Sequence, residues 1–490
     1  MKIHQLFLEQ AYKTPGRWAV QDERERWTYE TLAGEVHKRT EQLIDAGVTE
    51  GNIIALLQEN SRLWLRDLLA VSACGAIALP LHAESTQQEL ARLFKTVQPD
   101  WILRLPAERD EASYRSDQPE LVALGKRTMR QAFPMRTVGQ LNELLLIGLT
   151  SGSTGAPKAY VKSHSSWTRI MDDWRYAFDL SLQERVVAPL SLSYSAQLFP
   201  LVHALCTGGE AVTLASFSPR VLLYARGTSL HITPAALSSL CNYIESGKGD
   251  ASSLPERIIS VGNKLSQVLR ARVSRLNPNT RIYEYYGSSE MGCVSVLKPE
   301  TASRFPDSVG EPFPGVEITF FQEEAHGIPG DSMPCGKLYV RSPQSFEGYM
   351  GEASLTASGF KGEWVTSHDL GYWTGEKMVR LIGRDRDIVK SGGSLVSTAE
   401  LEAVLCQMPE VVDAAVVALP DEKRGEIIGA CLVLKEQGQL SSVRKRCTVE
   451  LPPYKRPRSF IAVEELPKTR NGKPDKEKLR QQLLQDKETP

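Results

Sequence analysis

A short segment rich in hydroxyl groups and glycine, residues 149–158 (LTSGSTGAPK), follows an apolar run at residues 144–149. Its glycines let backbone N–H groups turn towards an anion, its hydroxyls can donate to phosphate oxygens, and Lys158 adds a positive charge. It is not a Walker A loop, because Pro157 stands where the second glycine belongs and Ala159 follows the lysine. We expect a polyphosphate-binding loop here; the alternative is a flexible Ser/Gly linker.

Three further motifs are ambiguous when each is taken alone. In residues 285–290 (YYGSSE), Glu290 is suited to Mg²⁺ and an aromatic ring to a base, but a hairpin with a solvated glutamate fits as well. In residues 367–372 (SHDLGY) and 382–387 (IGRDRD), an aspartate suits a ribose diol and an arginine suits ribose or phosphate oxygens, or both form ordinary turns. Residues 466–475 (LPKTRNGKPD) place a lysine at a turn tip, or form a solvated basic loop.

Composition excludes several classes of function. The chain has 490 residues, 41% apolar and 24% charged, with a net charge of −1, so we expect about three globular domains and no nucleic-acid partner. None of the eight cysteines forms a CxxC pair, which favours buried thiols in a reducing compartment. The N-terminus lacks an apolar signal core, and the longest nearly uncharged stretch, 68–81, is too short for a membrane span. We therefore expect a cytoplasmic protein.

The elements that must position these motifs alternate between strand and helix. A helix is expected from about residue 28 to 45, ended by Ala46-Gly47, followed by a strand at 52–57, a helix from about Ser61 and a strand at 76–81. The same alternation recurs over residues 185–234. It indicates an α/β fold of parallel-type sheets covered by helices.

The character of the sequence changes after residue 308. Residues 308–389 are rich in Gly and Pro with short alternating runs, which predicts a β-rich subdomain. Beyond it, a helix at about 397–406, strands at 411–419 and 428–434, and a helical tail at 475–490 predict a compact α+β unit. The expected organisation is a large N-terminal domain, residues 1–385, and a small mobile C-terminal domain, residues 386–490.

Taken together and in this order, the four signals resemble the adenylate-forming superfamily. Its members include acyl-CoA synthetases, the adenylation domains of non-ribosomal peptide synthetases and firefly luciferases. The resemblance implies two steps: ATP and a carboxylate give acyl-AMP and pyrophosphate, and a thiol then attacks the acyl-AMP and releases AMP. It implies ATP and Mg²⁺ as cofactors, with coenzyme A or a carrier-protein phosphopantetheine as the thiol.

The resemblance also implies roles for individual residues. These roles would be divided between an N-terminal AMP-binding domain and a C-terminal lid domain. Lys473, Thr154 and Glu290 would be catalytic, Glu290 as the Mg²⁺ ligand and Lys473 between the carboxylate and the α-phosphate. The residues that would bind ATP or AMP are Thr150, Ser151, Gly152, Ser153, Thr154, Gly155, Lys158, Gly262, Asn263, Tyr286, Gly287, Ser288, Ser289, Asp369 and Arg384. Ser391, Gly392 and Gly393 would line the pantetheine tunnel, and Arg386 would be the hinge.

The acyl pocket departs from two family patterns. Ser195 stands where peptide synthetase domains place the aspartate that pairs with a substrate amine, so we expect α-amino acids to be poor substrates. Leu192 replaces a histidine common in acyl-CoA ligases, and His203 downstream is expected to be a core or surface residue. An acyl- or aryl-CoA ligase, an enzyme that loads a carrier protein, and a catalytically weak nucleotide-binding homologue remain as hypotheses. Ala159 and Arg386, which also depart from the family, would bear on loop closure and domain rotation.

Overall fold

The computed structural model shows two compact units of the chain. It describes residues 1–104, 119–124, 141–150, 158–321, 335–384, 388–391, 394–421, 425–436, 438–467 and 474–488. The first unit comprises Met1–Glu317 and Val340–Val365, and the second comprises Ile318–Tyr339 and Thr366–Pro490. The border between these compact units differs from the domain boundary predicted between residues 385 and 386. That boundary between functional domains stays a prediction.

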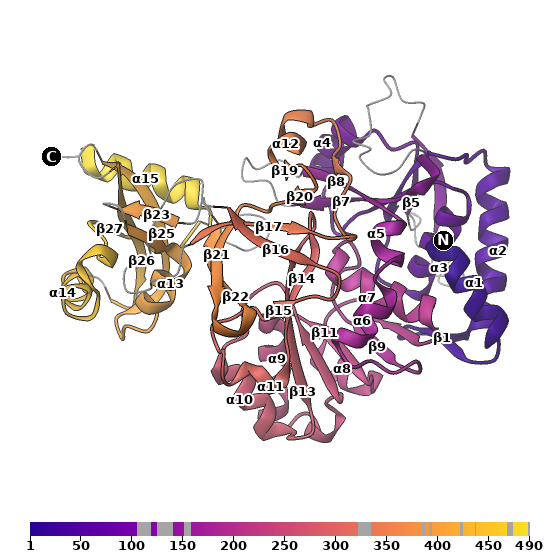
Figure 1. Ribbon diagram of the computed structural model, residues 1–490, viewed down its shortest axis with the longest axis horizontal. Coiled ribbons are helices and arrows are strands. Elements are labelled where there is room, and N and C mark those ends of the chain that lie inside the picture. Colours follow the sequence, from indigo (N-terminus) through magenta and orange to yellow (C-terminus); the bar gives the residue numbers. More distant parts are fainter. Residues whose placement is uncertain are drawn as a thin grey trace. The chain divides into compact units, whose positions relative to one another are not determined.

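A nine-stranded sheet forms one layer of the first unit (Figure 1), and six of its strands run parallel in the order β1-β10-β9-β11-β12-β13. Antiparallel β2 lies at one edge and β14 and β15 at the other. The strands are β1 (Trp18–Gln21), β2 (Arg26–Thr28), β9 (Arg185–Ala188), β10 (Glu210–Thr213), β11 (Ser229–Ile232), β12 (Arg257–Ser260), β13 (Arg281–Ser288), β14 (Gly292–Leu297) and β15 (Glu311–Pro312). Helices α7 (Ser195–Thr207), α8 (Pro219–Ala225), α9 (Pro234–Glu245) and α10 (Gln267–Leu276) connect the strands.

A seven-stranded sheet of the first unit has the order β18-β8-β7-β4-β3-β5-β6. Strands β7, β4, β3 and β5 are parallel, as expected from βα alternation, while β8 and β18 add an antiparallel edge. The strands are β3 (Ile53–Leu57), β4 (Ile77–Pro80), β5 (Trp101–Arg104), β6 (Glu120–Ala123), β7 (Leu144–Thr150), β8 (Lys158–Ser163) and β18 (Gly348–Tyr349).

The helices predicted near the N-terminus are confirmed. Helix α2 (Tyr29–Asp45) begins after Thr28, whose side chain accepts a hydrogen bond from the Thr31 N–H, and it ends before Gly47 at φ 97°. Helix α3 (Arg62–Ala73) is capped in the same way by Ser61. The apolar stretch 68–81 is the buried end of α3 followed by β4, as the sequence indicated.

The predicted β-rich region forms a six-stranded sheet, β19-β20-β17-β21-β22 with β16 beside β17. Its strands are β16 (Glu317–Phe321), β17 (Gly336–Arg341), β19 (Phe360–Lys361), β20 (Trp364–Val365), β21 (Asp369–Thr374) and β22 (Met378–Arg384). The hairpin of β21 and β22 belongs to the second unit.

The end of the chain folds around a five-stranded sheet, β24-β23-β26-β25 with β27 beside β26 (Figure 1). On long strands β25 (Val411–Asp421) and β26 (Gly425–Leu434), alternate side chains enter two separate cores. One core contains Leu401 of α13 (Thr398–Leu405) and Val443 of α14 (Leu440–Glu450), and the other contains Leu479 of α15 (Lys476–Glu488). Because helices cover both faces, both strands are almost continuously apolar.

Candidate active site

The predicted phosphate loop connects β7 to β8. Thr150 ends β7 and Lys158 begins β8, and the two are Cα partners in the antiparallel ladder, so they close the loop between them. Both are only partly buried. The loop residues Ser151, Gly152, Ser153, Thr154 and Gly155 lie outside the described residues.

Strand β8 separates a polar face from an apolar face. Ala159 and Val161 are buried in the hydrophobic core, which accommodates the methyl group of Ala159. Lys158, Tyr160 and Lys162 alternate with them and therefore share the opposite face. This face carries the side chains that link the predicted motifs.

Glu290 lies in the turn between antiparallel β13 and β14, so the hairpin named above as the alternative is present, and the metal role of Glu290 stays a prediction. Its carboxylate is engaged: Tyr349 Oη donates to Glu290 Oε1 at 2.5 Å, and the Phe346 N–H donates to the Glu290 carbonyl at 2.8 Å. Lys158 Nζ lies 5.7 Å from the centroid of the Tyr349 ring. One tyrosine thus joins the lysine of the first motif to the glutamate of the second.

Tyr160 makes a second link between these elements. Its ring packs on Gly148 so closely that a Cβ there would lie 2.1 Å from the ring. Burial raises the pKa of its hydroxyl, while the nearby Ser195 and Ser289 side chains act in the opposite direction. Ser195 begins α7, and the Ser289 side chain comes from the Glu290 turn. The start of α7 and this turn therefore both lie near the Tyr160 hydroxyl.

Lys162 belongs to the same polar face and was missed by the sequence analysis. Its side chain is buried, and Nζ donates to the Gln344 carbonyl. Burial lowers the pKa of Lys162 to about 7, while the charges of Glu290 and Glu347 favour the protonated amine. The two-residue period from Lys158 could have placed Lys162 on this face, but its carboxylate neighbours come from distant segments.

Several of the residues predicted to bind ATP or AMP lie at the carboxyl ends of β12 and β13. These strands are parallel neighbours, so the Gly262-Asn263 turn after β12 and the end of β13, with Tyr286 and Gly287, share one edge of the sheet. Gly262 has φ 97°. A Cβ at Gly287 would lie 2.2 Å from the Gly292 carbonyl oxygen, so the hairpin requires glycine there. The arrangement leaves Gly262 and Asn263 exposed.

Helix α7 and the residues just before it contain the positions discussed above for the acyl pocket. Leu192, before the helix, is fully buried, and Ser195 is its first residue. His203 is a core residue, as expected: its Nε2 lies 2.9 Å from the Met171 carbonyl, and burial lowers its pKa to about 4. Phe199, one turn after Ser195, packs on Trp174 with ring centroids 4.8 Å apart.

In the second unit, the predicted ribose-binding residues are brought together. Asp369 and Arg384 are Cα partners at one end of the β21–β22 hairpin, 15 residues apart in sequence. Asp369 is buried and accepts a hydrogen bond from Ser367 Oγ, while His368 between them has φ 63°. A non-glycine residue in this region indicates a strained turn, which is typical of functional sites. The Arg384 side chain lies outside the described part of the structure.

The remaining predicted residues also belong to the second unit. Ser391 ends β23 (Ile388–Ser391) and is the Cα partner of Ser394 in β24 (Ser394–Ser397). The predicted hinge, the two glycines and the lysine lie outside the described residues: Arg386, Gly392, Gly393 and Lys473.

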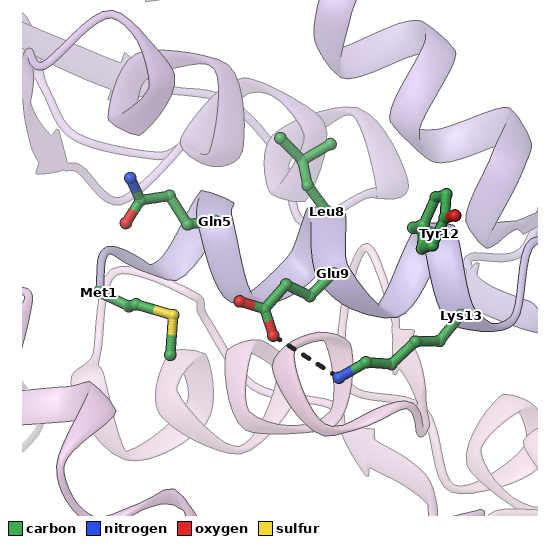
Figure 2. A pocket seen from close by; sticks show the side chains of 6 residues that line it. All are labelled: Met1, Gln5, Leu8, Glu9, Tyr12 and Lys13. Atoms are coloured by element: carbon green, nitrogen blue, oxygen red, sulfur yellow. Dashed lines mark ion pairs between the residues drawn. The ribbon is translucent and has the colours of Figure 1, made fainter.

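Several other features of the described residues bear on function. No cluster of three or more His, Cys, Asp or Glu side chains among them could hold a metal ion. Within the same residues, no helix is both long and apolar enough to cross a membrane. All eight cysteines are free, and six are buried. A surface hollow on α1 (Ile3–Lys13), lined by Leu8, Tyr12 and their neighbours, contains none of the predicted site residues (Figure 2).

Comparison with known families identifies both halves of the chain. The family model for AMP-binding enzymes matches residues 7–350, and the model for the C-terminal domain of AMP-binding enzymes matches residues 400–473. The first match alone covers more than half of the chain.

Individual relatives match over almost the whole length. An uncharacterized acyl–CoA ligase of Bacillus subtilis is 30% identical over 96% of both chains. The indoleacetate–CoA ligase of Aromatoleum aromaticum is 27% identical over 95% of both. The structure of o-succinylbenzoate CoA synthetase from Bacillus subtilis, in complex with its acyl-adenylate intermediate, has a TM-score of 0.80 at 22% identity and covers 97% of each chain, which supports the same fold.

Proposed function

Because the chain belongs to the AMP-binding enzyme family, we propose that it activates a carboxylic acid with ATP and transfers the acyl group to coenzyme A. The observation that carries this proposal is the linked set of Lys158, Tyr349 and Glu290 beside the loop that Thr150 and Lys158 close. Such a set links a cation that can bind phosphates to a carboxylate that can bind a metal ion. Two relatives that match end to end are named as CoA ligases, which supports a thiol acceptor.

The first step is an in-line displacement at the α-phosphorus. A carboxylate oxygen of the acid forms the new P–O bond, and the bond to the β-phosphate oxygen breaks to release pyrophosphate. Both reactants are anions, so positioning and charge neutralisation dominate the barrier. In the proposal, Lys158 and the hydroxyls of Thr150, Ser151, Ser153 and Thr154 hold the β- and γ-phosphates.

Glu290 fits the role of a Mg²⁺ ligand. Mg²⁺ is commonly bound by one or two carboxylates together with substrate phosphates rather than by a protein cage. A single carboxylate beside the phosphate lysine matches that donor set, and no larger cluster among the described residues competes with it. The ion would neutralise charge on the phosphates, while Tyr349 orients the carboxylate that holds it.

The second unit supplies the other proposed roles. Asp369 and Arg384, which are Cα partners across the β21–β22 hairpin, bind the ribose hydroxyls. Lys473 bridges the carboxylate and the α-phosphate. In the second step the thiol attacks the acyl carbon, the C–O bond to AMP breaks, and Ser391, Gly392 and Gly393 line its path. Arg386 is the proposed hinge between domains 1–385 and 386–490. Eight free cysteines support the cytoplasmic location that forms part of this proposal.

In this proposal, the carboxylic acid substrate has no α-amino group. Ser195 provides no charge to pair with an ammonium group, and its neighbourhood includes the buried, neutral Leu192 and the hydroxyl of Tyr160. An unpaired ammonium group in such a site costs several kcal/mol, on the order of 1,000-fold in binding. α-Amino acids are therefore expected to fail as substrates.

Pyrophosphate release with Mg·ATP, measured across fatty, aryl and amino acids with and without CoA, tests the proposal. Release that depends on one class of acid, accelerates with CoA and yields the thioester is the expected result. Acid-dependent release that CoA leaves unchanged would contradict CoA as the acceptor and favour a carrier-protein thiol. Absence of acid-dependent release across the panel would favour the nucleotide-binding homologue instead.

A further inference from the structure

Asn60 is a buried residue whose amide bridges the seven-stranded and the nine-stranded sheets. It lies in the loop after β3 of the seven-stranded sheet, just before Ser61, which caps α3. Its Nδ2 donates to the Leu190 carbonyl at 2.8 Å and to the Leu214 carbonyl at 3.0 Å. Leu190 follows β9 and Leu214 follows β10, two strands of the nine-stranded sheet. The bridge therefore lies at the carboxyl ends of three strands, where open α/β sheets bind their ligands.

A third hydrogen bond uses the oxygen of the same amide. Asn60 Oδ1 accepts from the Leu192 N–H at 3.0 Å. The amide thus donates twice and accepts once, all to backbone groups. A carboxylate of the same size could not donate, and an apolar side chain could neither donate nor accept. Asparagine is therefore matched to this position by its chemistry as well as by its volume.

These bonds hold the connection between β9 and α7, residues 189–194. The connection contains neither helix nor strand, so no regular ladder of backbone bonds fixes its place. Asn60 holds it from the other sheet. Gln197 ties it to α7, because its Oε1 accepts from the Leu190 N–H at 3.1 Å. The place of this connection beside the strand ends thus depends on two side-chain amides.

The connection leads to the positions predicted for the acyl pocket. Leu192 belongs to it and is bonded directly to Asn60, and Ser195 begins the helix that follows. The three partners of Asn60 are not among the residues predicted to bind ATP or AMP. A shift of the connection should therefore displace one wall of the acyl pocket and leave the predicted nucleotide contacts in place.

We propose that Asn60 is a positioning residue for the acid substrate. By holding residues 189–194 at the carboxyl ends of both sheets, it sets the place of a wall of the acyl pocket and thereby the choice between acids of different length. Without the amide, two buried carbonyls and one N–H lose a partner, and the connection moves until they find others. This inference rests on the proposed function, because it takes Leu192 and Ser195 to line the acyl pocket.

Competition between two acids, measured on the full chain, tests the inference. The enzyme receives Mg·ATP, hydroxylamine and equal amounts of the best acid of the panel above and the same acid with one more methylene group. The pair would be hexanoate and heptanoate for a fatty acid, or benzoate and phenylacetate for an aryl acid. Hydroxylamine displaces AMP from each acyl-adenylate, and mass spectrometry quantifies the two hydroxamates. Their ratio reports the ratio of kcat/KM values and does not depend on the amount of folded enzyme.

Asn60→Leu is the main variant, because it keeps the approximate side-chain size and removes all three bonds. It should change the hydroxamate ratio about tenfold, a size typical of discrimination by one methylene group. The KM for the preferred acid should rise, while the KM for ATP should stay within about twofold of wild type. A merely structural loss would lower the amount of active enzyme and leave both the ratio and the two KM values unchanged.

Gln58→Met is the matched control. Gln58 lies in the same loop, two residues before Asn60, and is also buried. Its Nε2 donates to Asp67 Oδ2 at 2.9 Å, and Asp67 belongs to α3 rather than to the connection. The variant should lower the unfolding temperature and leave the hydroxamate ratio unchanged. A change as large as that in Asn60→Leu would show that any loss in this loop alters the pocket, and it would overturn the inference.

Asn60→Ala keeps the inference testable if Asn60→Leu does not fold. The smaller side chain leaves room for water that can bond the three backbone groups, so this variant should fold and change the ratio about threefold. An unchanged ratio in the folded variant, or equal rises in the KM values for acid and ATP, would contradict the role of Asn60. A wild type that forms no hydroxamate and releases no pyrophosphate with any acid would instead reject the proposed function.

Discussion

Glu290 and Asp369 are both carboxylates set by antiparallel hairpins, but they are held in different ways. Asp369 accepts from Ser367, two residues away, and faces Arg384 across its own hairpin. Glu290 accepts from Tyr349, 59 residues away, and its turn is bonded to the segment that carries this tyrosine. The contacts described for the first site lie within one short segment and its hairpin, whereas those of the second join segments distant in sequence.

The difference predicts different sensitivities. A locally built site persists whenever its hairpin forms, since its partners are close in sequence. A site assembled from distant segments depends on every contact that fastens them, and removing one polar partner leaves the other unpaired. Substitutions around Glu290 should therefore cost more activity than equivalent substitutions around Asp369.

The largest effect is expected for Glu290→Gln. An amide keeps the shape and the Tyr349 contact but removes the charge that would hold Mg²⁺, so adenylation should fall roughly 100- to 1,000-fold. Acid-dependent ATP–pyrophosphate exchange at saturating Mg²⁺ measures this loss. A fall of less than about threefold would mean that another group holds the metal ion.

Tyr349→Phe should have the next largest effect. It removes the hydroxyl that orients Glu290 and keeps the ring beside Lys158. Losing a hydrogen bond to a charged group costs about 1.5–3 kcal/mol, so kcat/KM for Mg·ATP should fall by about tenfold or more. Titrating Mg²⁺ in the same assay separates a weakened metal site from a general loss of folding, which would leave the Mg²⁺ midpoint unchanged.

Ser367→Ala should have a smaller effect than Tyr349→Phe. It removes the corresponding hydroxyl beside Asp369, but the backbone register still sets Asp369 opposite Arg384. The KM for ATP should rise about threefold with kcat little changed, because ribose binding contributes to both ground and transition states. A larger loss than in Tyr349→Phe would break the comparison between local and assembled sites.

Acidification should destabilise the first unit more than the second. Burial lowers the pKa values of His164 and His231 to about 3 and of His203 to about 4, and all three belong to the first unit. Their unfolded forms bind protons below about pH 6.5 while the folded forms do not, so stability rises with pH in this window and is lost on acidification. Each histidine should cost about 1 kcal/mol per pH unit below that value.

Hydrogen exchange at pH 7 and pH 5, corrected for intrinsic rates, measures this difference. Peptides of the first unit should gain exchange relative to peptides from β25 and β26. The reverse order would show that groups other than these histidines control acid stability.

Much of the fold could be predicted because its signals are local. The cap at Thr28, the glycine after α2 and the apolar runs of β25 and β26 each specify an element from neighbouring residues. The hairpin that carries Glu290 could be predicted for the same reason. The division of the chain into compact units could not, because it depends on contacts between distant strands.

The residues that surround and hold the predicted site were harder to predict from the sequence. Tyr349, Gln344 and Glu347 reach Glu290 and Lys162 from a segment without any motif that suggested a role. Tyr160 and Lys162 follow the phosphate motif directly, but as a strand of mixed composition they offered no chemical signal until their faces were known. Sequence motifs identified the groups proposed to touch ATP, and the tertiary structure was needed to find those that hold them.

Transfer of oxygen from the acid tests the central claim most directly. The chain would be incubated with Mg·ATP, CoA and an accepted carboxylic acid labelled with ¹⁸O in its carboxylate, and the products analysed by mass spectrometry. An acyl-adenylate route predicts one ¹⁸O atom in AMP and none in pyrophosphate, because the attacking oxygen stays on the α-phosphorus when the thiol displaces AMP. Label in inorganic phosphate, or unlabelled AMP alongside the thioester, would contradict the account.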